Sequence, residues 1–448
     1  MANFLTALRN QAASGEDIFT LPMGKREVYV VASPVLAEAI LITHKDNFVK
    51  LGGDGKASGL SAVLGEGLLT NSNRSSWFQQ RRMIQPLLYK QSLSGWTALI
   101  AEQTKVMLAS WQPKAEVVLD EALLETTLNI IYPLMFGVTA EEARATHNQL
   151  IRLPLHLATA KKRDVRTLRE RLDPIILDLI QTRRQVVAST SDVNASNTAK
   201  LNIGLPTPLL DALIQAKDAS TGETMNDIQL RDEVATLISA GHETTAYALT
   251  WACALVAHYP QVQERLQAEL DGFFEAGGDA LDLLKLPYLN AVWQETLRLY
   301  PTIPTAPRVC LQDTTLTTST GDMTISQGAR VLVSIYLIQR HLTYWQDADI
   351  FRPERFLDVD ATKADAIKAD ESRKHKLAYM PFGAGERFCV GRELARLEGL
   401  IMLAHCVYHM NFDDLPTLPV ANVAISLLPK EPIKVRVYAR TAQISSEM

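Results

Sequence analysis

Apolar residues recur at the helical period through most of the middle of the chain. The pattern predicts one long helix over residues 226–258, which Tyr259-Pro260 ends. The stretch 76–111 has the same period, with an interruption near Pro86. An apolar run follows at 119–136, and further helices are predicted from residue 140 and over 161–187, 261–274 and 289–299. We therefore expect helical regions over residues 70–300 and 390–410.

Alternating and β-branched runs predict strands near both ends of the chain. The run Val28–Val31 ends at Ser33-Pro34. The runs Thr314–Thr320 and Met323–Ile325 flank Gly321-Asp322, which favours a hairpin. Residues 329–336 and 433–438 predict further strands. The predicted fold class is mainly α with small β-sheets (α+β), and its β-rich parts lie near 20–50, 305–340 and 415–440.

Two stretches lack a period and are predicted to be loops. Residues 52–67 contain six glycines, which predicts a mobile loop that is either plain surface or a lid over a substrate. Residues 188–202 are dense in Ser, Thr and Asn, which is typical of an exposed loop.

Composition narrows the class of protein. Of the 448 residues 47% are hydrophobic, so a large core is possible, and the net charge of −5 argues against a nucleic-acid binder recognised by bulk charge. Four cysteines without paired spacing indicate a reducing compartment rather than a disulfide framework. We see neither a signal peptide nor an apolar run of roughly 18 residues. We therefore expect a soluble, cytoplasmic protein with no membrane anchor.

The richest local pattern surrounds Cys389. This cysteine lies between Gly385 and Gly391, two residues after Arg387, and an apolar helical run follows it. Glycines permit a sharp turn or the close approach of a flat ligand. A helix N-terminus lowers the pKa of a thiol, so the pattern predicts a thiolate in a tight loop. The alternative is a buried structural cysteine after a glycine-rich turn.

The order Phe382-x-x-Gly385-x-Arg387-x-Cys389-x-Gly391 resembles the haem-ligand loop of the cytochrome P-450 family. The resemblance implies that Cys389 is the metal ligand of haem b, with Phe382 and Gly391 in the same cofactor-binding loop. Arg387 would pair with a haem propionate. It also implies one triangular-prism domain over residues 1–448, with the haem between the long central helix and the helix after the cysteine loop.

A second motif, Ala240-Gly241-His242-Glu243-Thr244-Thr245, lies inside the long helix. An acid beside hydroxyls on an apolar helix is costly unless it is paired or hydrated, and Gly241 is a poor helix former. The stretch therefore predicts a local distortion, the alternative being a solvent-facing acid in an irregular helix. It resembles the oxygen-binding groove of the family, which implies that Glu243 and Thr244 are catalytic and deliver protons to bound dioxygen. We interpret His242 as structural.

Two weaker motifs gain weight from their order along the chain. Glu295 and Arg298, followed much later by Arg355, resemble the family's buried structural triad. Arg308 matches a position that binds a haem propionate. Trp77 and Arg81 lie on one helical face, resemble the family's C-helix, and are expected to donate to a haem propionate. Without the other motifs, Trp77 would be interpreted as a half-buried core residue.

These motifs together predict a haem-thiolate monooxygenase that inserts one atom of dioxygen into a small apolar substrate such as a fatty acid or terpenoid. The chain ends about 60 residues after Cys389, so we expect no fused reductase and a separate ferredoxin or flavodoxin with its NAD(P)H reductase. We expect that partner to bind near Arg392 and Arg396, beside Arg81 and Arg82. By analogy, the substrate pocket is lined by Ala240, Ile303, Thr305, Val423 and Ile425.

Two other functions remain open from the sequence. A haem-thiolate isomerase or dehydratase would use the same cysteine without activating oxygen, which the intact Glu243-Thr244 pair disfavours. A haem-binding sensor would not turn over its ligand.

Overall fold

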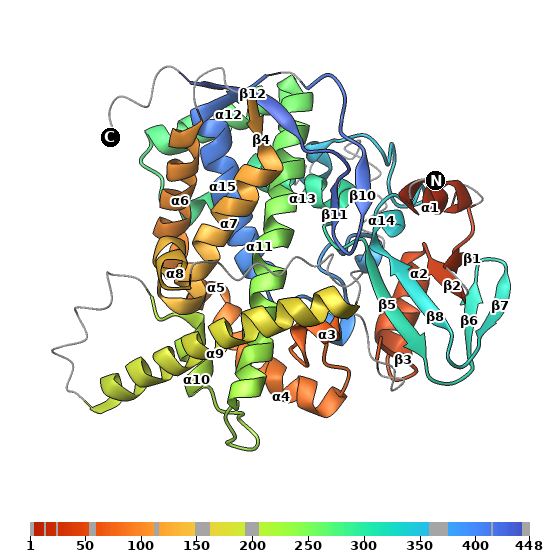
Figure 1. The fold of residues 1–448 in the computed structure, drawn as a ribbon. Helices are drawn as coiled ribbons and strands as arrows, with labels where there is room; N and C mark the ends of the chain where they lie inside the picture. The colour runs from red at the N-terminus through yellow and green to blue at the C-terminus, as the bar shows by residue number, and fades with distance from the viewer. Residues whose placement is uncertain are drawn as a thin grey trace.

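The structure is a computed structural model that describes residues 4–12, 15–23, 26–52, 60–111, 116–147, 162–192, 206–357, 375–413 and 415–440. Most of the helices gather on one side of the molecule, and the largest sheet lies on the other (Figure 1). The predicted class, mainly α with small β-sheets, is confirmed. No helix in the described ranges is long and apolar enough to cross a membrane.

The longest helix, α11 (Asp227–His258), runs through the centre of the helical part (Figure 1). Its N-terminus is fixed by a capping box, in which the Asn226 side chain accepts from the backbone of Gln229 while the Gln229 side chain accepts from the backbone of Asn226. The sequence placed this helix to within one residue. It packs against α7 (Leu119–Phe136), α9 (Lys162–Asp192) and α15 (Arg392–His409).

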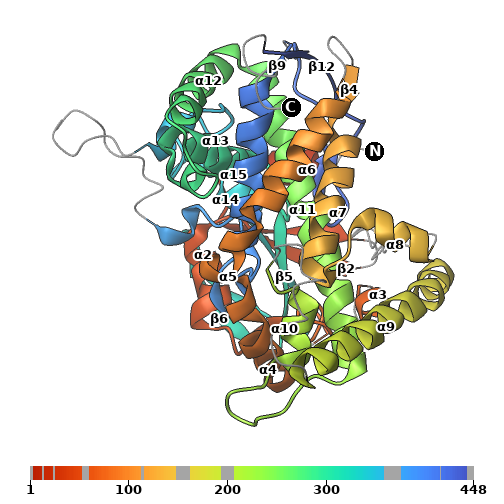
Figure 2. The same cartoon turned by 90° about the vertical axis from the view of Figure 1, so that its left-hand side faces the viewer.

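Several other helices surround α11, and α6 (Thr97–Ser110) lies against both α7 and α15 (Figure 2). The longer helices of the rest of the chain are α1 (Phe4–Ala12), α4 (Arg74–Ile84), α8 (Ala140–His147), α10 (Leu209–Gln215), α12 (Pro260–Glu275) and α13 (Pro287–Leu299). The short ones are α2 (Pro34–Glu38), η1 (Ala39–Thr43), α3 (Ser61–Leu64), η2 (Gln85–Leu88), α5 (Lys90–Leu93), η3 (Ser94–Trp96), η6 (Asp282–Lys285), α14 (Ile335–Ile338), η7 (Pro353–Phe356), η9 (Lys376–Ala378) and η10 (Gly385–Arg387).

The largest sheet has the strand order β1-β2-β8-β5-β3. Its strands are β1 (Ile18–Met23), β2 (Arg26–Val31), β3 (Phe48–Lys50), β5 (Thr305–Cys310) and β8 (Arg330–Ser334). Only the β2–β8 pair in this sheet is parallel. In the register of β3 and β5, Lys50 faces Arg308, so two cations from distant parts of the sequence become neighbours at a sheet edge.

The remaining strands form three smaller sheets. They are the hairpin β6 (Thr314–Thr318) and β7 (Gly321–Ile325), the pair β10 (Ala421–Val423) and β11 (Leu427–Pro429), and the sheet β4 (Glu116–Val118), β12 (Lys434–Ala439) and β9 (Met410–Phe412). The predicted hairpin is present, but Gly321 starts its second strand with φ 125° instead of forming the turn.

Several predicted boundaries differ from the structure. The strand expected over 329–336 ends at Ser334, because residues 335–338 form α14. The helix expected over 161–187 continues to Asp192, inside the stretch expected to be a loop. Residues 193–202 of that loop and 53–59 of the glycine-rich loop lie outside the described residues. The expected distortion of the long helix is not seen as a break, since α11 is α-helical throughout.

A buried guanidinium joins α9, α3 and α11. The Arg231 side chain is 3% exposed and donates to Asp173 Oδ1 at 2.8 Å, to Asp232 Oδ1 at 2.9 Å and to the Val63 carbonyl at 3.0 Å. Asp232 in turn accepts from the backbone N–H of Glu66 at 2.7 Å. Because an unpaired buried charge is costly, these bonds fix the loop that precedes α4 onto the first half of α11.

Candidate active site

The loop before α15 is shaped by two glycines in the left-handed region. Gly383 has φ 75° and Gly385 has φ 70°. A side chain on Gly385 would overlap the carbonyl of Leu41, whereas Gly383 faces open space. The loop is closed by the backbone N–H of Cys389, which donates to the Phe382 carbonyl at 3.0 Å. Glycine at position 385 is therefore required twice, by its φ and by the close backbone contact.

Two opposing effects act on the thiol of Cys389. The residue is exposed, yet the surrounding protein raises the pKa of its thiol by desolvation. The N–H groups of Gly391 and Arg392, and the charges of Arg81 and Arg392, act in the opposite direction. The predicted lowering of the thiol pKa by the helix N-terminus is therefore wrong for the protein alone, because desolvation outweighs it.

Three cations, Lys50, Arg308 and Arg387, lie close together next to the cysteine loop. Arg308 is 7% exposed, and among the described residues its guanidinium donates to the Pro307 carbonyl at 2.9 Å. Burial lowers the pKa of Arg308 to about 10, and burial with the charge of Arg308 lowers the pKa of Arg387 to about 10. Burial and both arginines lower the pKa of Lys50 to about 7. Within the described ranges, no carboxylate forms an ion pair with any of the three. The cluster is therefore suited to an anionic ligand with more than one negative charge.

Lys50 was missed by the sequence analysis. It ends a three-residue strand, and a lysine there has the pattern of an ordinary edge residue. Its placement depends on pairing with Arg308, which is 258 positions further along the chain. The only sequence signal was a cation immediately before the glycine-rich loop.

Trp77 is positioned differently from the expectation. Its indole Nε1 donates to the Leu68 carbonyl at 3.1 Å, so the predicted donation to a haem propionate is not what this structure shows. The ring instead lies under two guanidinium groups, with Arg387 at 3.9 Å and Arg81 at 5.2 Å from its centroid. Arg81 also donates to the Phe388 carbonyl at 2.9 Å. Trp77 thus supports the arginines through cation–π contacts and fixes the loop before α4.

The structure brings Glu295, Arg298 and Arg355 together in the interior. Glu295 and Arg298 are 0% exposed and form a two-bond pair at 2.6 and 2.7 Å. Arg355 Nε donates to Glu295 Oε1 at 3.2 Å. Arg298 also donates to the carbonyls of Gln339 and Ala348. These bonds tie α13 to the segment 339–355, which fits the scaffold role expected from the sequence.

One face of α11 borders an internal space. Most of this helix from Leu230 onward is buried, but Leu237, Ala240, Gly241, Thr244 and Tyr247 are partly exposed. These positions share one helical face, which is the spacing i, i+3, i+4, i+7 and i+10. A half-exposed stripe on a central helix requires a cavity alongside it. The predicted pocket residue Ala240 and the predicted catalytic residue Thr244 both lie on this stripe.

Glu243 and Thr244 point their polar atoms to different partners. The Thr244 hydroxyl donates to the Ala240 carbonyl at 2.6 Å, which keeps the helix closed at this turn. The Glu243 carboxyl is 2% exposed and accepts from the Ser426 hydroxyl at 3.0 Å. Ser426 was not identified from the sequence. His242 is buried with Nδ1 2.7 Å from the Ile238 carbonyl, in keeping with a structural role.

The remaining predicted pocket residues are Ile303, Thr305, Val423 and Ile425, and all are partly exposed. The segment before β5 is joined to α11 because the Thr302 hydroxyl donates to the Thr244 carbonyl at 3.3 Å. Val423 also packs against the apolar cluster that includes residues of α1. The structure thus brings the 302–305 segment next to the stripe on α11.

Comparison with known proteins identifies the family. The family model described as Cytochrome P-450 matches residues 2–437. The chain belongs to the cytochrome P-450 family. A Mycobacterium tuberculosis protein named cytochrome P-450 137 is 29% identical over 94% of this chain and 82% of its own length. The cyclooctat-9-en-7-ol 5-monooxygenase of Streptomyces melanosporofaciens is 28% identical over 87% of this chain and 81% of its own length. The crystal structure of a cytochrome P-450 (CYP102L1) superposes with a TM-score of 0.79 at 23% identity, covering 98% of this chain and 95% of that one.

Membership makes this protein a haem-thiolate monooxygenase that binds haem b. The residues present fit that cofactor. Cys389 is exposed and lies two residues from Arg387, a member of the cluster of three cations, and a haem carries two propionates. Charge-assisted bonds to propionates would relieve the burial cost of those cations.

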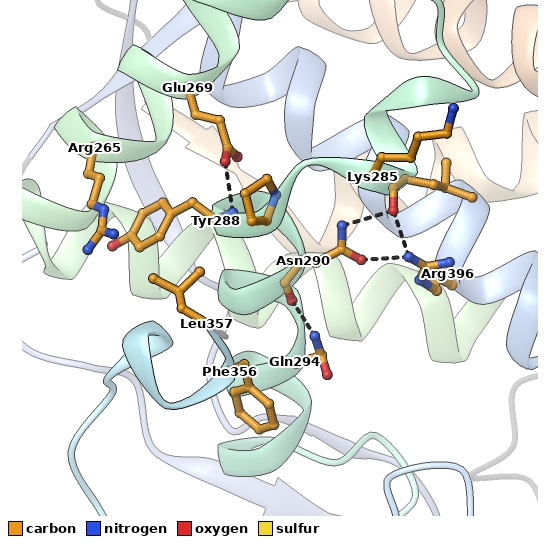
Figure 3. Close-up of a pocket in the computed structure, with 11 residues that line it drawn as sticks. Arg265, Glu269, Lys285, Tyr288, Asn290, Gln294, Phe356, Leu357 and Arg396 are labelled. Atoms are coloured by element: carbon orange, nitrogen blue, oxygen red, sulfur yellow. Dashed lines mark hydrogen bonds between the residues drawn. The ribbon is translucent and has the colours of Figure 1, made fainter. Parts of the chain in front are cut away.

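A second hollow of about 640 Å³ in this cytochrome P-450 lies between α12, α13, η6, η7 and the start of α15 (Figure 3). Arg396 belongs to the wall of this hollow. Its Nη2 donates to the Leu284 carbonyl at 2.7 Å and to Asn290 Oδ1 at 2.8 Å. Asn290 donates to the same Leu284 carbonyl at 3.0 Å. Arg396 therefore holds α15 against α13, which limits its availability to a protein partner.

Proposed function

We propose that Cys389 is the axial ligand of haem b and that Arg308, Arg387 and Lys50 bind its propionates. The observation that carries this proposal is the unneutralised cation cluster beside an exposed sulfur. Phe382 and Gly391 belong to the same loop, the first as backbone acceptor for Cys389 and the second as N-cap of α15. Arg81 contributes through the Phe388 carbonyl and its charge near the sulfur.

Haem bound through a thiolate supplies the capacity to activate dioxygen and insert one oxygen atom into a C–H or C=C bond. The chain then has to position the substrate and deliver protons. We assign the stripe on α11 as the wall beside which the substrate lies, with Ile303, Thr305, Val423 and Ile425 contributing to the remaining walls. Small apolar molecules, among them terpenoids and fatty acids, fit such a wall.

Glu243 and Thr244 are proposed to move protons. Glu243 is buried, and its carboxyl is held by the hydrogen bond from Ser426. The next residue, Thr244, carries the hydroxyl on the stripe beside the cavity. A rotation of the Thr244 side chain would free its hydroxyl from the Ala240 carbonyl to donate into the cavity, while Glu243 supplies the proton. Ser426 acts as a positioning residue for that acid.

Electrons are proposed to come singly from a ferredoxin or flavodoxin that an NAD(P)H reductase reduces. Arg392, at the start of α15, has 51% of its side chain exposed, pairs with the neighbouring Glu393 and lies 5.4 Å from the centroid of the Phe388 ring. It can meet an acidic partner, whereas Arg396 and Arg82 are held by Asn290 and Asp218. The partner surface proposed from the sequence is therefore narrowed to the region of Arg392.

The ferrous–carbonyl spectrum of the wild type and of Cys389→Ala, each at full haem content, tests the iron ligand. The wild type should show the red-shifted band of a thiolate ligand, and Cys389→Ala should lose it. Retention of that band in the alanine variant would refute the assignment. Product formation that requires both NAD(P)H and dioxygen separates the monooxygenase from an isomerase or a sensor.

A further inference from the structure

Two polar atoms buried on α11 have no hydrogen-bond partner in the part of the chain that the structure describes. They are Glu233 Oε1 and Thr236 Oγ1, on side chains of residues that are 0% and 3% exposed. They lie one helical turn apart, next to residues 67–68 of the loop before α4. Buried polar atoms are normally satisfied, so a pair of open ones in one place calls for a ligand or for water.

The open hydroxyl of Thr236 differs from the other threonines of this helix. Thr244, Thr245 and Thr250 each donate to the carbonyl four residues earlier, at 2.6, 3.1 and 2.8 Å. Thr236 does not use the equivalent carbonyl of Asp232. The loop backbone comes so close here that a side chain on Gly67 would overlap the Thr236 hydroxyl. The hydroxyl is thus held against the loop backbone without a hydrogen-bond partner among the described residues.

Glu233 is held at one oxygen and open at the other. Its Oε2 accepts from the backbone N–H of Leu68 at 3.0 Å. Burial, with a smaller contribution from the charge of Asp232, raises the pKa of Glu233 to about 8. At neutral pH the residue is therefore mostly an uncharged carboxylic acid, which can donate as well as accept.

The pair lies in line with the cavity-facing stripe. Glu233, Thr236, Ala240 and Thr244 follow the spacing i, i+3, i+7 and i+11, so they share one face of α11. The stripe is partly exposed from Leu237 onward and fully buried at Glu233, which places the acid at the closed end of the cavity. At a rise of about 1.5 Å per residue, Glu233 lies about 10 Å from Ala240 and about 16 Å from Thr244 along the helix axis.

We propose that Glu233 and Thr236 form a polar subsite that binds a hydroxyl or carbonyl oxygen of the substrate, at the end of the molecule remote from the carbon that is oxidised. This inference rests on the proposed function and refines its substrate class to an apolar skeleton bearing an alcohol or ketone. A neutral oxygen satisfies both open atoms. A free carboxylate would be buried without a cation of its own, because Arg231 already pairs with Asp173 and Asp232, so a fatty-acid anion is disfavoured.

Matched pairs of probes that differ by one hydroxyl test the subsite. Dodecane is compared with 1-dodecanol, and limonene with perillyl alcohol, while dodecanoate serves as the anionic probe. Binding to the haem-loaded protein is measured by the haem spin-state shift and, independently, by equilibrium dialysis. In at least one pair the alcohol should bind about tenfold more tightly than the hydrocarbon, the factor that one neutral hydrogen bond supplies, and dodecanoate should bind more weakly than 1-dodecanol.

Variants of Glu233 and Thr236 test whether these two residues cause the preference for the hydroxyl. Thr236→Val and Glu233→Leu should each weaken binding of the preferred alcohol about tenfold and change that of the hydrocarbon less than twofold. Glu233→Gln keeps a donor and should retain part of the preference. Thr250→Val removes a buried hydroxyl from the same helix, and Glu398→Leu removes another buried acid with an open oxygen. Both control variants should keep the full preference.

The subsite would be overturned if neither pair showed a preference for the hydroxyl. Failure of every alcohol to bind at its solubility limit counts as the same result. An equal loss in the variants and their controls, or tighter binding of dodecanoate than of 1-dodecanol, would also overturn the subsite. A protein with a normal thiolate spectrum that gives these results refutes the subsite alone. Loss of the thiolate spectrum in the wild type would instead refute the proposed function.

Discussion

Replacement of Lys50 by methionine should stabilise the haem-free protein and weaken its hold on haem. The pKa of this lysine falls from 10.5 to about 7 because of burial and the charges of Arg308 and Arg387. At about 1.36 kcal/mol per pKa unit, this corresponds to an upper limit of about 4 kcal/mol at pH 7. The side chain is only partly covered, so solvent screens the cost, and we expect a gain of about 2 kcal/mol in Lys50→Met.

The pH dependence of this gain has a defined sign. The folded, haem-free state has the lower pKa for Lys50, so it binds fewer protons than the unfolded state between about pH 7 and 10.5. The cost of the lysine is fully present below pH 7 and disappears as the pH rises toward 10.5. The advantage of Lys50→Met should therefore be largest at pH 7 and below, and small at pH 10.

Urea unfolding of the haem-free protein at pH 7 and pH 9.5 measures the stability change, and transfer of haem to an excess of apomyoglobin measures retention. Lys50→Met should lose haem about tenfold faster, since one charge-assisted bond to a propionate is removed. Lys285→Met is the matched control, because that lysine is 73% exposed and pairs only with Asp282. A haem-free Lys50→Met protein no more stable than the control, with unchanged haem loss, would refute the propionate role of Lys50.

Three further predictions follow from the contacts described. Glu295→Gln should lower the free energy of unfolding by about 3–5 kcal/mol, because it leaves buried arginine charge without its counter-ion, as urea titration would show. Gly385→Ala should lose haem on purification, whereas Gly383→Ala, with a similar φ and open space, should cost only about 1 kcal/mol and retain it. Arg392→Glu should slow reduction by an acidic ferredoxin, measured by stopped flow at low salt, and leave the fold intact. Arg396→Glu should chiefly lower the melting temperature. Equal effects of the two variants on the reduction rate would argue against a partner surface centred on Arg392.

The helical period and the cysteine-loop motif revealed most of the fold and the centre of the site. Residues 226–258 were predicted to be helical and α11 covers Asp227–His258, because its capping box and the following proline are local signals. The position of Cys389 at the start of a helix was predicted for the same reason. Short-range patterns succeed where local residues alone decide the structure.

Features that depend on distant partners were missed or predicted wrongly. The pKa of Cys389 was expected to be lowered by the helix N-terminus, but the packing that raises it comes from tertiary structure. Trp77 has an acceptor for its N–H in Leu68, and no sequence pattern identifies that carbonyl. Lys50 joins the cation cluster only through pairing of two strands. The open oxygen of Glu233 likewise depends on how close the loop before α4 approaches α11.

The joint made by Arg231 constrains how a substrate can reach the cavity. Its guanidinium binds Asp173 on α9, Asp232 on α11 and the Val63 carbonyl on α3 at once. Lifting α9 alone at this point would take the Asp173 carboxylate away from the buried guanidinium and leave Asp232 as its one carboxylate partner in the described ranges, which costs free energy. We therefore expect α9 to pivot about Asp173 as a fixed hinge, so that the opening motion grows with distance from that residue and molecules enter past the far ends of the helix.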